Sequence, residues 1–237
     1  MDADVLTTRV ADGIAVITLG TAKRIYIDQE TSDALFEVLK KYADDGDIRV
    51  VIVTGAAPGS FVRHYSIPEL IRFAESVRAT GREWPEARFI DGPISVCESM
   101  PKPVIAAISG TCLAGAFELT LSCDVRIAED GDYQIGFPET NFGLCPGAGG
   151  TQRLPRTIGM PAALMHILMG VPVSPREAER RGWYTKPSAA RLSIARWRSP
   201  DICRHSRRSR SPTSSVSSVA PPRHRSRKDC YSNAGCS

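Results

Sequence analysis

The rest of this chain is predicted to be organised around the segment Pro103-Val-Ile-Ala-Ala-Ile108 and the residues that follow it, Ser109-Gly-Thr-Cys-Leu-Ala-Gly-Ala-Phe-Glu-Leu119. Its first part is apolar and rich in β-branched residues, which is typical of a buried strand. The second part is rich in small residues and predicts a turn from that strand into a helix. The first amides of a helix lack partners within the helix and carry partial positive charge, so they stabilise an anionic oxygen placed against them. Glu118 is predicted to lie about one turn further along, within reach of whatever those amides bind.

A second acidic residue, Glu139, follows downstream, ahead of the glycine-dense run Pro146-Gly-Ala-Gly-Gly150. Two carboxyl groups that flank a polarised carbonyl make a site for proton transfer. The glycines are interpreted mainly as a tight turn that forms a wall behind Glu139. Taken singly, each carboxylate has an ordinary explanation, because Glu118 could pair with the helix dipole and Glu139 could be a turn residue.

The order of these residues resembles the core of the crotonase, or enoyl-CoA hydratase/isomerase, family. The family signature runs from a strand through Gly-x-x-x-Gly-Gly-x-x-Glu-Leu to a Cys-Asp pair, a Pro-Glu pair and Pro-Gly-Ala-Gly-Gly-Thr-Gln-Arg-Leu. So many matches in one order are far more specific than a lone glycine motif. The matching residues are Gly110, Gly115, Glu118, Leu119, Cys123, Asp124, Pro138, Glu139 and the run from Pro146 to Leu154.

The resemblance implies an α/β fold built as a spiral of repeated β-β-α turns. The residue pattern alone supports a mixed α/β domain, with strands over Gly13–Leu19 and Val50–Gly55 and a helix between them. The apolar positions of that helix recur at helical spacing, and Asp28 or Thr31 is expected to cap its start. These apolar positions are Leu35, Val38, Leu39 and Tyr42.

The resemblance also implies an oxyanion hole, in which two backbone amides bind one substrate oxygen. The first amide falls on Tyr65 in a segment similar to the family's Phe-x-x-Gly-x-Asp-Leu, and the second falls on Gly115. This segment departs from the pattern, because His64 replaces the glycine and Ser66 the aspartate. His64 is a candidate substrate contact, although a lone histidine more often has a structural role. Ser66 and Glu69 predict a capping box at the start of a helix.

The implied function is addition of water to a 2-enoyl-CoA thioester in fatty acid metabolism. Family hydratases carry acids at both positions, whereas many isomerases and hydrolases keep only one, so the presence of Glu118 and Glu139 favours a hydratase, a lyase. Alternatives are an enoyl-CoA isomerase, another acyl-CoA thioester enzyme of this fold, or a truncated inactive member. No metal or separate cofactor is implied, because coenzyme A is part of the substrate. The family further implies a homotrimer or hexamer.

The charge of the chain, +4 overall, is divided unevenly along its length. From Trp183 onward there are twelve Lys or Arg against two acids, which leaves eighteen against twenty-four for the residues up to Gly182. The resemblance ends at that point, so we predict an acyl-CoA-binding core over residues 1–182, without the family's C-terminal helical region. Residues 183–237 form a basic Ser/Arg/Pro-rich tail of a composition typical of disorder, and we hypothesise a change of reading frame there. The tail lacks interleaved aromatic residues, so a nucleic-acid partner is not predicted.

The sequence contains no stretch of about eighteen uncharged apolar residues, so no membrane span is predicted. The acidic start Met1-Asp-Ala-Asp lacks the basic flank and apolar region of a secretory signal. The chain has 7 cysteines, an odd number, without the paired spacing of metal ligands. These features together predict reduced thiols and a cytoplasmic location.

Overall fold

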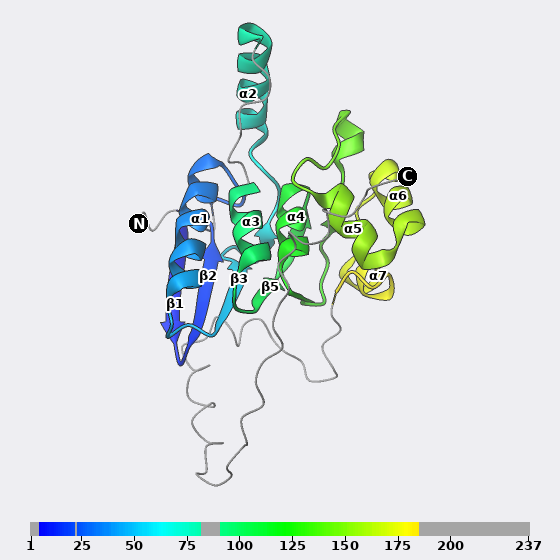
Figure 1. The fold of residues 1–237 in the computed structure, drawn as a ribbon. Helices are drawn as coiled ribbons and strands as arrows, with labels where there is room; N and C mark the ends of the chain where they lie inside the picture. The colour runs from blue at the N-terminus through cyan, green and yellow to red at the C-terminus, as the bar shows by residue number, and fades with distance from the viewer. Residues whose placement is uncertain (1–4, 22, 82–90, 185–237) are drawn as a thin grey trace, which may run out of the picture. The chain divides into compact units, whose positions relative to one another are not determined.

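The computed structural model describes residues 5–21, 23–81 and 91–184, and Figure 1 shows their fold. Pairs of strands alternate with helices over most of this length. The elements in chain order are β1 (Leu6–Ala11), β2 (Ile14–Leu19), α1 (Gln29–Asp44), β3 (Val50–Gly55), β4 (Gly59–Val62), α2 (Ile67–Thr80), α3 (Asp91–Ser99), β5 (Val104–Ile108), β6 (Gly110–Leu113), α4 (Gly115–Ser122), β7 (Val125–Ala128), β8 (Ile135–Gly136), the 3-10 turn η1 (Glu139–Phe142), α5 (Gly150–Ile158), α6 (Met160–Met169) and α7 (Pro175–Arg180).

The strands form two sheets, and from β3 onward consecutive strands alternate between the two sheets. The larger sheet has the order β1-β2-β3-β5-β7 and the smaller one β4-β6-β8. All pairs are parallel except β1 with β2, which are antiparallel. In the pairs β3-β4, β5-β6 and β7-β8 the first strand joins the large sheet and the second joins the small one. The predicted α/β spiral of β-β-α turns is therefore confirmed.

Helix α1 forms where the apolar spacing predicts it. Leu35, Val38, Leu39 and Tyr42 are all buried. Asp28 is the N-cap, and its Oδ1 accepts a hydrogen bond of 2.9 Å from the Thr31 amide. Figure 1 shows α1, α3 and α4 side by side along the large sheet, so these three helices form one layer.

The short strands β4 and β6 are not evident from the sequence, because glycine-rich segments predict turns. The structure shows why glycine is needed there. A Cβ added to Gly110 would lie 1.9 Å from the carbonyl carbon of Gly59, so the two backbones approach too closely for a side chain. A glycine inside a strand commonly marks such a close approach.

The predicted capping box at Ser66 and Glu69 is wrong. Ser66 precedes α2 but its side chain makes no capping hydrogen bond. Glu69 instead accepts a hydrogen bond of 3.0 Å on Oε2 from the Gln29 amide, at the start of α1. The reason is tertiary: Ile27 and Tyr65 form a parallel bridge, which brings the beginnings of the two helices together.

Trp183, the first residue after the predicted core, is fully buried. Its amide donates to the Ala178 carbonyl at 3.0 Å, and the Trp183 carbonyl accepts a hydrogen bond of 3.1 Å from Arg126 Nε. Its ring centroid lies 5.3 Å from that of Phe117 in α4. Packing of the core thus extends past Gly182. Residues 185–237 of the predicted tail lie outside the described residues, and the division into core and disordered tail stays a prediction.

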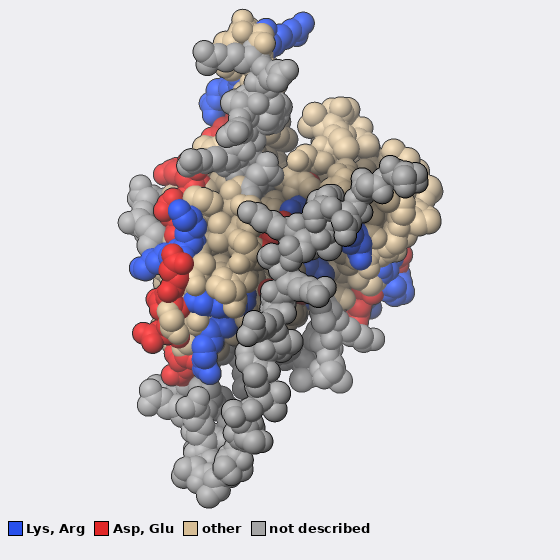
Figure 2. All heavy atoms as spheres, in the orientation of Figure 1, with Lys and Arg blue, Asp and Glu red and all other residues tan. Residues whose placement is uncertain are grey.

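The charged and uncharged surfaces are separated. In Figure 2 acidic and basic side chains gather over α1, whereas the region occupied in Figure 1 by η1 and α6 is mostly uncharged. Helix α6 and its neighbours expose several large apolar side chains: Phe142, Leu144, Met160, Leu164, Met165, Leu168, Met169 and Val171. Among the described helices, none has the length and apolar character that crossing a bilayer requires.

Candidate active site

The predicted site residues follow the three strands of the small sheet. Tyr65 comes shortly after β4, Gly115 begins α4 after β6, and Glu139 begins η1 after β8. The strands are parallel, so their carboxyl ends meet at the same edge of the sheet. Ligands of α/β proteins characteristically bind at such an edge. The topology therefore gathers segments that are distant in sequence.

The turn from β6 into α4 is strained. Ala114, its N-cap, has φ 53° and ψ −131°, a conformation that non-glycine residues rarely adopt. Such a residue costs about 1–3 kcal/mol and persists only when its surroundings hold it. Its amide donates to the Gly136 carbonyl at 2.9 Å, and its carbonyl accepts from the Glu118 amide at 3.0 Å. The helix therefore starts abruptly, and the Gly115 amide, in its first turn, has no acceptor within the helix.

Glu118 is held by the loop that follows η1. Its Oε1 accepts hydrogen bonds from the amides of Ala148, at 2.8 Å, and Gly150, at 2.7 Å. The side chain is buried. Backbone donors that converge on one oxygen favour a charged carboxylate. The glycine-dense run, predicted to form a wall behind Glu139, thus donates two of its amides to Glu118.

Gly150 is the point where the Glu118 and Glu139 segments meet. A Cβ on this glycine would lie 2.5 Å from the Phe137 ring and 3.0 Å from Glu118 Oε1. Phe137 precedes Glu139 by two residues, and its ring centroid is 4.9 Å from that of Phe117 beside Glu118. The structure thus brings both predicted acids into one region.

Glu139 occupies the opposite kind of environment from Glu118. It is 9% exposed, and its buried Oε2 has no hydrogen-bond partner among the described residues. Burial, with a smaller contribution from the negative charge of Glu118, raises the pKa of Glu139 to about 8. A carboxyl group in such surroundings carries its proton at neutral pH.

The segment predicted to supply the first oxyanion-hole amide lies against residues 25–27. The Arg63 amide donates to the Ile25 carbonyl at 2.8 Å, and the Ser66 amide donates to the Ile27 carbonyl at 2.6 Å. Tyr65 between them is buried. His64 Nδ1 lies 2.7 Å from the Tyr65 carbonyl, and its ring centroid is 4.7 Å from that of Tyr26. These contacts are within the chain, so the substrate contact of His64 stays a prediction.

His166 in α6 supports the segment that carries Glu139. Its Nε2 accepts a hydrogen bond of 3.3 Å from the Phe137 amide, and its ring packs edge-on against Trp183 with centroids 4.3 Å apart. Because Nε2 accepts, the ring is neutral with its proton on Nδ1. Burial, together with the nearby Arg181, lowers the pKa of His166 to about 4.

Acid is therefore expected to destabilise the fold through His166. The unfolded chain binds a proton at this residue near pH 6.5, whereas the folded chain resists it until about pH 4, so stability is lost as pH falls between these values. The full effect is roughly 3 kcal/mol. Urea unfolding across this range should show a shallower pH dependence for His166→Gln than for the wild type. Equal dependence in both proteins would contradict this role.

The described residues contain no group of three or more His, Cys, Asp or Glu side chains arranged to hold a metal ion. The cysteines in this part of the chain are unpaired, with Cys97, Cys112 and Cys123 buried and Cys145 exposed. The expectation that no cofactor is needed stays a prediction.

The sequence profile of the enoyl-CoA hydratase/isomerase family matches residues 9–192. The chain belongs to this family. Among solved structures with the same crotonase fold is an enoyl-CoA hydratase from Bacillus anthracis, with a TM-score of 0.68 and 33% identity over 76% of this chain and 68% of that one. DspI from Pseudomonas aeruginosa is also similar, with a TM-score of 0.65 and 27% identity over 86% of this chain and 84% of that one.

Curated relatives of the chain are much longer than it is. The glyoxysomal fatty acid beta-oxidation multifunctional protein MFP-a of Brassica napus is 36% identical over 199 residues, which are 81% of this chain and 26% of that protein. The fatty acid oxidation complex subunit alpha of Shewanella oneidensis is 33% identical over 178 residues, which are 74% of this chain and 25% of that protein. The chain thus spans about a quarter of these relatives.

Sequence reasoning missed the residues that hold Glu118 in this family member. The donors at Ala148 and Gly150 are backbone amides, which leave no trace in residue type. The available signal was the whole run from Pro146 to Leu154, whose glycines permit close backbone approach. Arg153 belongs to the same run and contacts the loop from α5.

Proposed function

We propose that this chain is an enoyl-CoA hydratase, a lyase that adds water across the double bond of a 2-enoyl-CoA thioester. The observation that carries the proposal is the contrast between two buried carboxyl groups in one region. Glu118 accepts two backbone amides, whereas Glu139 is unsatisfied at Oε2 and has a raised pKa. Environments that divide two carboxyl groups in this way assign a base and an acid.

In the proposed reaction the thioester oxygen binds the amides of Tyr65 and Gly115. Negative charge accumulates on that oxygen as water attacks the β-carbon, and an amide aimed at it is typically worth about 3 kcal/mol. The abrupt start of α4 after Ala114 supports this role for Gly115. Tyr65 follows β4 and Gly115 follows β6, and these two strands pair in parallel.

Glu118 is proposed to take a proton from the attacking water, whose oxygen bonds to the β-carbon. Protonated Glu139 gives its proton to the α-carbon as the enolate collapses. The product is the 3-hydroxyacyl thioester, and transfer of one proton between the two carboxyl groups restores their starting states. Positioned acids and bases of this kind typically contribute about 10²–10⁴-fold each.

Purified protein incubated with crotonyl-CoA tests the proposal. The absorbance of the conjugated thioester should decrease with time as 3-hydroxybutyryl-CoA forms, and the product is identified by mass spectrometry. A 3-enoyl-CoA substrate is assayed in parallel for double-bond migration. Absence of hydration on every acyl chain length, in a protein shown to be folded, would reject the hydratase.

A second candidate is an enoyl-CoA isomerase or another acyl-CoA thioester enzyme of the same fold. The specific observation in its favour is the oxyanion segment, where His64 and Ser66 depart from the pattern of hydratases. Migration of the double bond without hydration, or release of free coenzyme A, would identify these activities. A folded chain without any of them would be the truncated inactive member.

Self-association into a homotrimer or hexamer is proposed as well. The apolar side chains exposed along α6, which include Leu164, Met165, Leu168 and Met169, support it because large apolar patches commonly mark interfaces. Light scattering of the purified chain measures the assembly, and a monomer at micromolar concentration would reject it. The cytoplasmic location, the absence of a nucleic-acid partner and the place in fatty acid metabolism stay predictions.

A further inference from the structure

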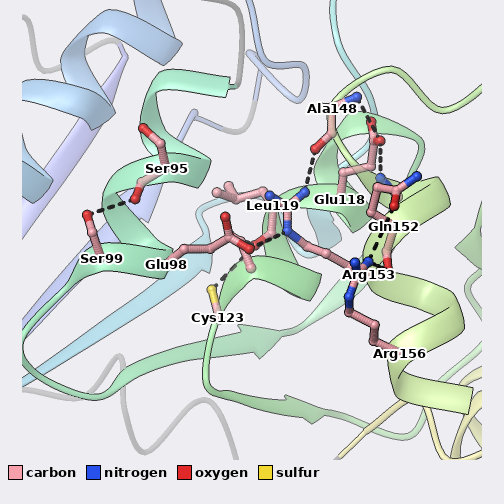
Figure 3. A network of polar contacts seen from close by, with 12 residues as sticks. Ser95, Glu98, Ser99, Glu118, Leu119, Cys123, Ala148, Gln152, Arg153 and Arg156 are labelled. Atoms are coloured by element: carbon pink, nitrogen blue, oxygen red, sulfur yellow. Dashed lines mark hydrogen bonds and ion pairs between the residues drawn. The ribbon is translucent and has the colours of Figure 1, made fainter. Parts of the chain in front are cut away.

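We infer that Arg153 in α5 is a positioning residue for hydration, which holds the loop 146–150 so that its two amides converge on Glu118. The inference rests on the proposed function, in which Glu118 is the base. It assigns to Arg153 a role exerted through the loop rather than on the substrate. Figure 3 shows the network, which joins α3, α4, the loop and α5.

The contact between Arg153 and the loop lies between the two donors. Arg153 Nη1 donates to the Ala148 carbonyl at 2.6 Å, and this carbonyl belongs to the peptide that joins Ala148 to Gly149. The peptides on either side supply the amides of Ala148 and Gly150 that bind Glu118 Oε1. Peptides are planar, so fixing the middle one restricts the directions of both N–H groups.

Arg153 is itself held from the other side. Its Nε donates to Glu98 Oε1 of α3 at 2.9 Å, with side-chain exposures of 17% for Arg153 and 48% for Glu98. A partly exposed ion pair contributes little to stability. The ion pair matters more for the orientation of Arg153. The planar guanidinium presents donors on separate edges, so it can bind Glu98 and the Ala148 carbonyl at the same time. A lysine has one ammonium and cannot reproduce this arrangement.

Gly149 shows how closely the guanidinium is fitted to the loop. The residue has φ 94°, and a Cβ added to it would lie 2.0 Å from Arg153 Nη1. The carbonyl of Gly149 also accepts hydrogen bonds from the amides of Gln152 and Arg153 at the start of α5. Loop and arginine therefore depend on one another, and loss of the arginine frees the loop.

The experiment compares Arg153→Ala, Arg153→Lys and Arg156→Ala in the full chain. Arg156 is a matched control, since it is an exposed arginine of the same helix that bonds within that helix to Gln152. We expect kcat for crotonyl-CoA hydration to fall about 10–100-fold in Arg153→Ala, with KM within about twofold, because small misplacements of a catalytic group are costly. Arg153→Lys should be intermediate, and Arg156→Ala should match the wild type.

Two readouts separate positioning from general stability. The acidic limb of the pH profile of kcat/KM should move to higher pH in Arg153→Ala, because the carboxylate loses ordered donors. Hydrogen exchange at the Ala148 and Gly150 amides should become faster. A loss of thermal stability with an unchanged pH profile and unchanged exchange would show a structural role only and would overturn the inference.

The double variant that carries Arg153→Ala and Glu118→Gln tests the role of Arg153 separately from the proposed role of Glu118 as the base. If Arg153 acts through Glu118, adding Arg153→Ala to Glu118→Gln lowers kcat no further, since groups that act as a unit are not additive. An impaired Glu118→Gln together with a normal Arg153→Ala would overturn only the inference, whereas a fully active Glu118→Gln would overturn the proposed role of Glu118. Should Arg153→Ala fail to fold, Arg153→Lys carries the same test: reduced kcat supports the inference and wild-type kcat overturns it.

Discussion

Glu139→Gln is expected to lower kcat for hydration by about 10²–10⁴-fold and to make the fold more stable above pH 8. The activity is lost because glutamine cannot deliver a proton to the α-carbon. The gain in stability follows from the environment of Glu139, whose pKa is raised from 4.5 to about 8 by burial and then by Glu118. A residue that suits catalysis but opposes folding is a common feature of active sites.

Ionisation of Glu139 destabilises the folded state as pH rises. The folded state holds the proton more tightly than the unfolded state, so stability is greatest below pH 4.5 and decreases as pH rises towards 8. Glutamine cannot ionise and escapes this loss. At about pH 9 the variant should be more stable than the wild type by roughly 1–3 kcal/mol, an amount reduced by the cost of a buried amide.

Urea unfolding at about pH 5 and pH 9 measures this difference for Glu139→Gln. Glu37→Gln, on the exposed face of α1, is the control for loss of a carboxylate and should leave hydration unchanged. The wild-type kcat/KM should decline above about pH 8 as Glu139 loses its proton. A variant that keeps wild-type turnover, or one that is equally destabilised at both pH values, would contradict the assignment.

Glu118→Gln is expected to lower kcat by a similar factor, about 10²–10⁴-fold, with little change in stability. The glutamine oxygen can still accept from the amides of Ala148 and Gly150, so the loop keeps its place while the base is lost. Glu118→Ala removes the acceptor as well. It leaves the buried Gly150 amide and the half-buried Ala148 amide without this acceptor, and unfolding should become easier by about 2–4 kcal/mol.

The two substitutions at Glu118 therefore separate its role in catalysis from its role in stability. Steady-state kinetics with crotonyl-CoA measures the loss of kcat, and urea unfolding measures the change in the free energy of unfolding. If Glu118→Gln and Glu118→Ala were equally destabilised, the amide contacts would not be important for the fold. If Glu118→Gln turned over substrate at the wild-type rate, another residue would have to activate the water.

The residue pattern was enough to identify the family and to predict the two acids of the candidate site. The ordered matches from Gly110 to Leu154 cannot arise from composition alone, and they include Glu118, Glu139 and Gly115. The alternation of strands and helices and the buried face of α1 also followed, because both depend on the spacing of residues along one segment.

The contacts that hold the site together became visible only in the folded chain. The short strands β4, β6 and β8, the use of Glu69 at the start of α1 and the amides that bind Glu118 all join segments far apart in the chain. Arg153 and Glu98 meet in the same way. Apart from the ion pair of Arg153 with Glu98, these contacts use backbone groups on at least one side. Every residue carries such groups, so residue types cannot predict which of them will come together.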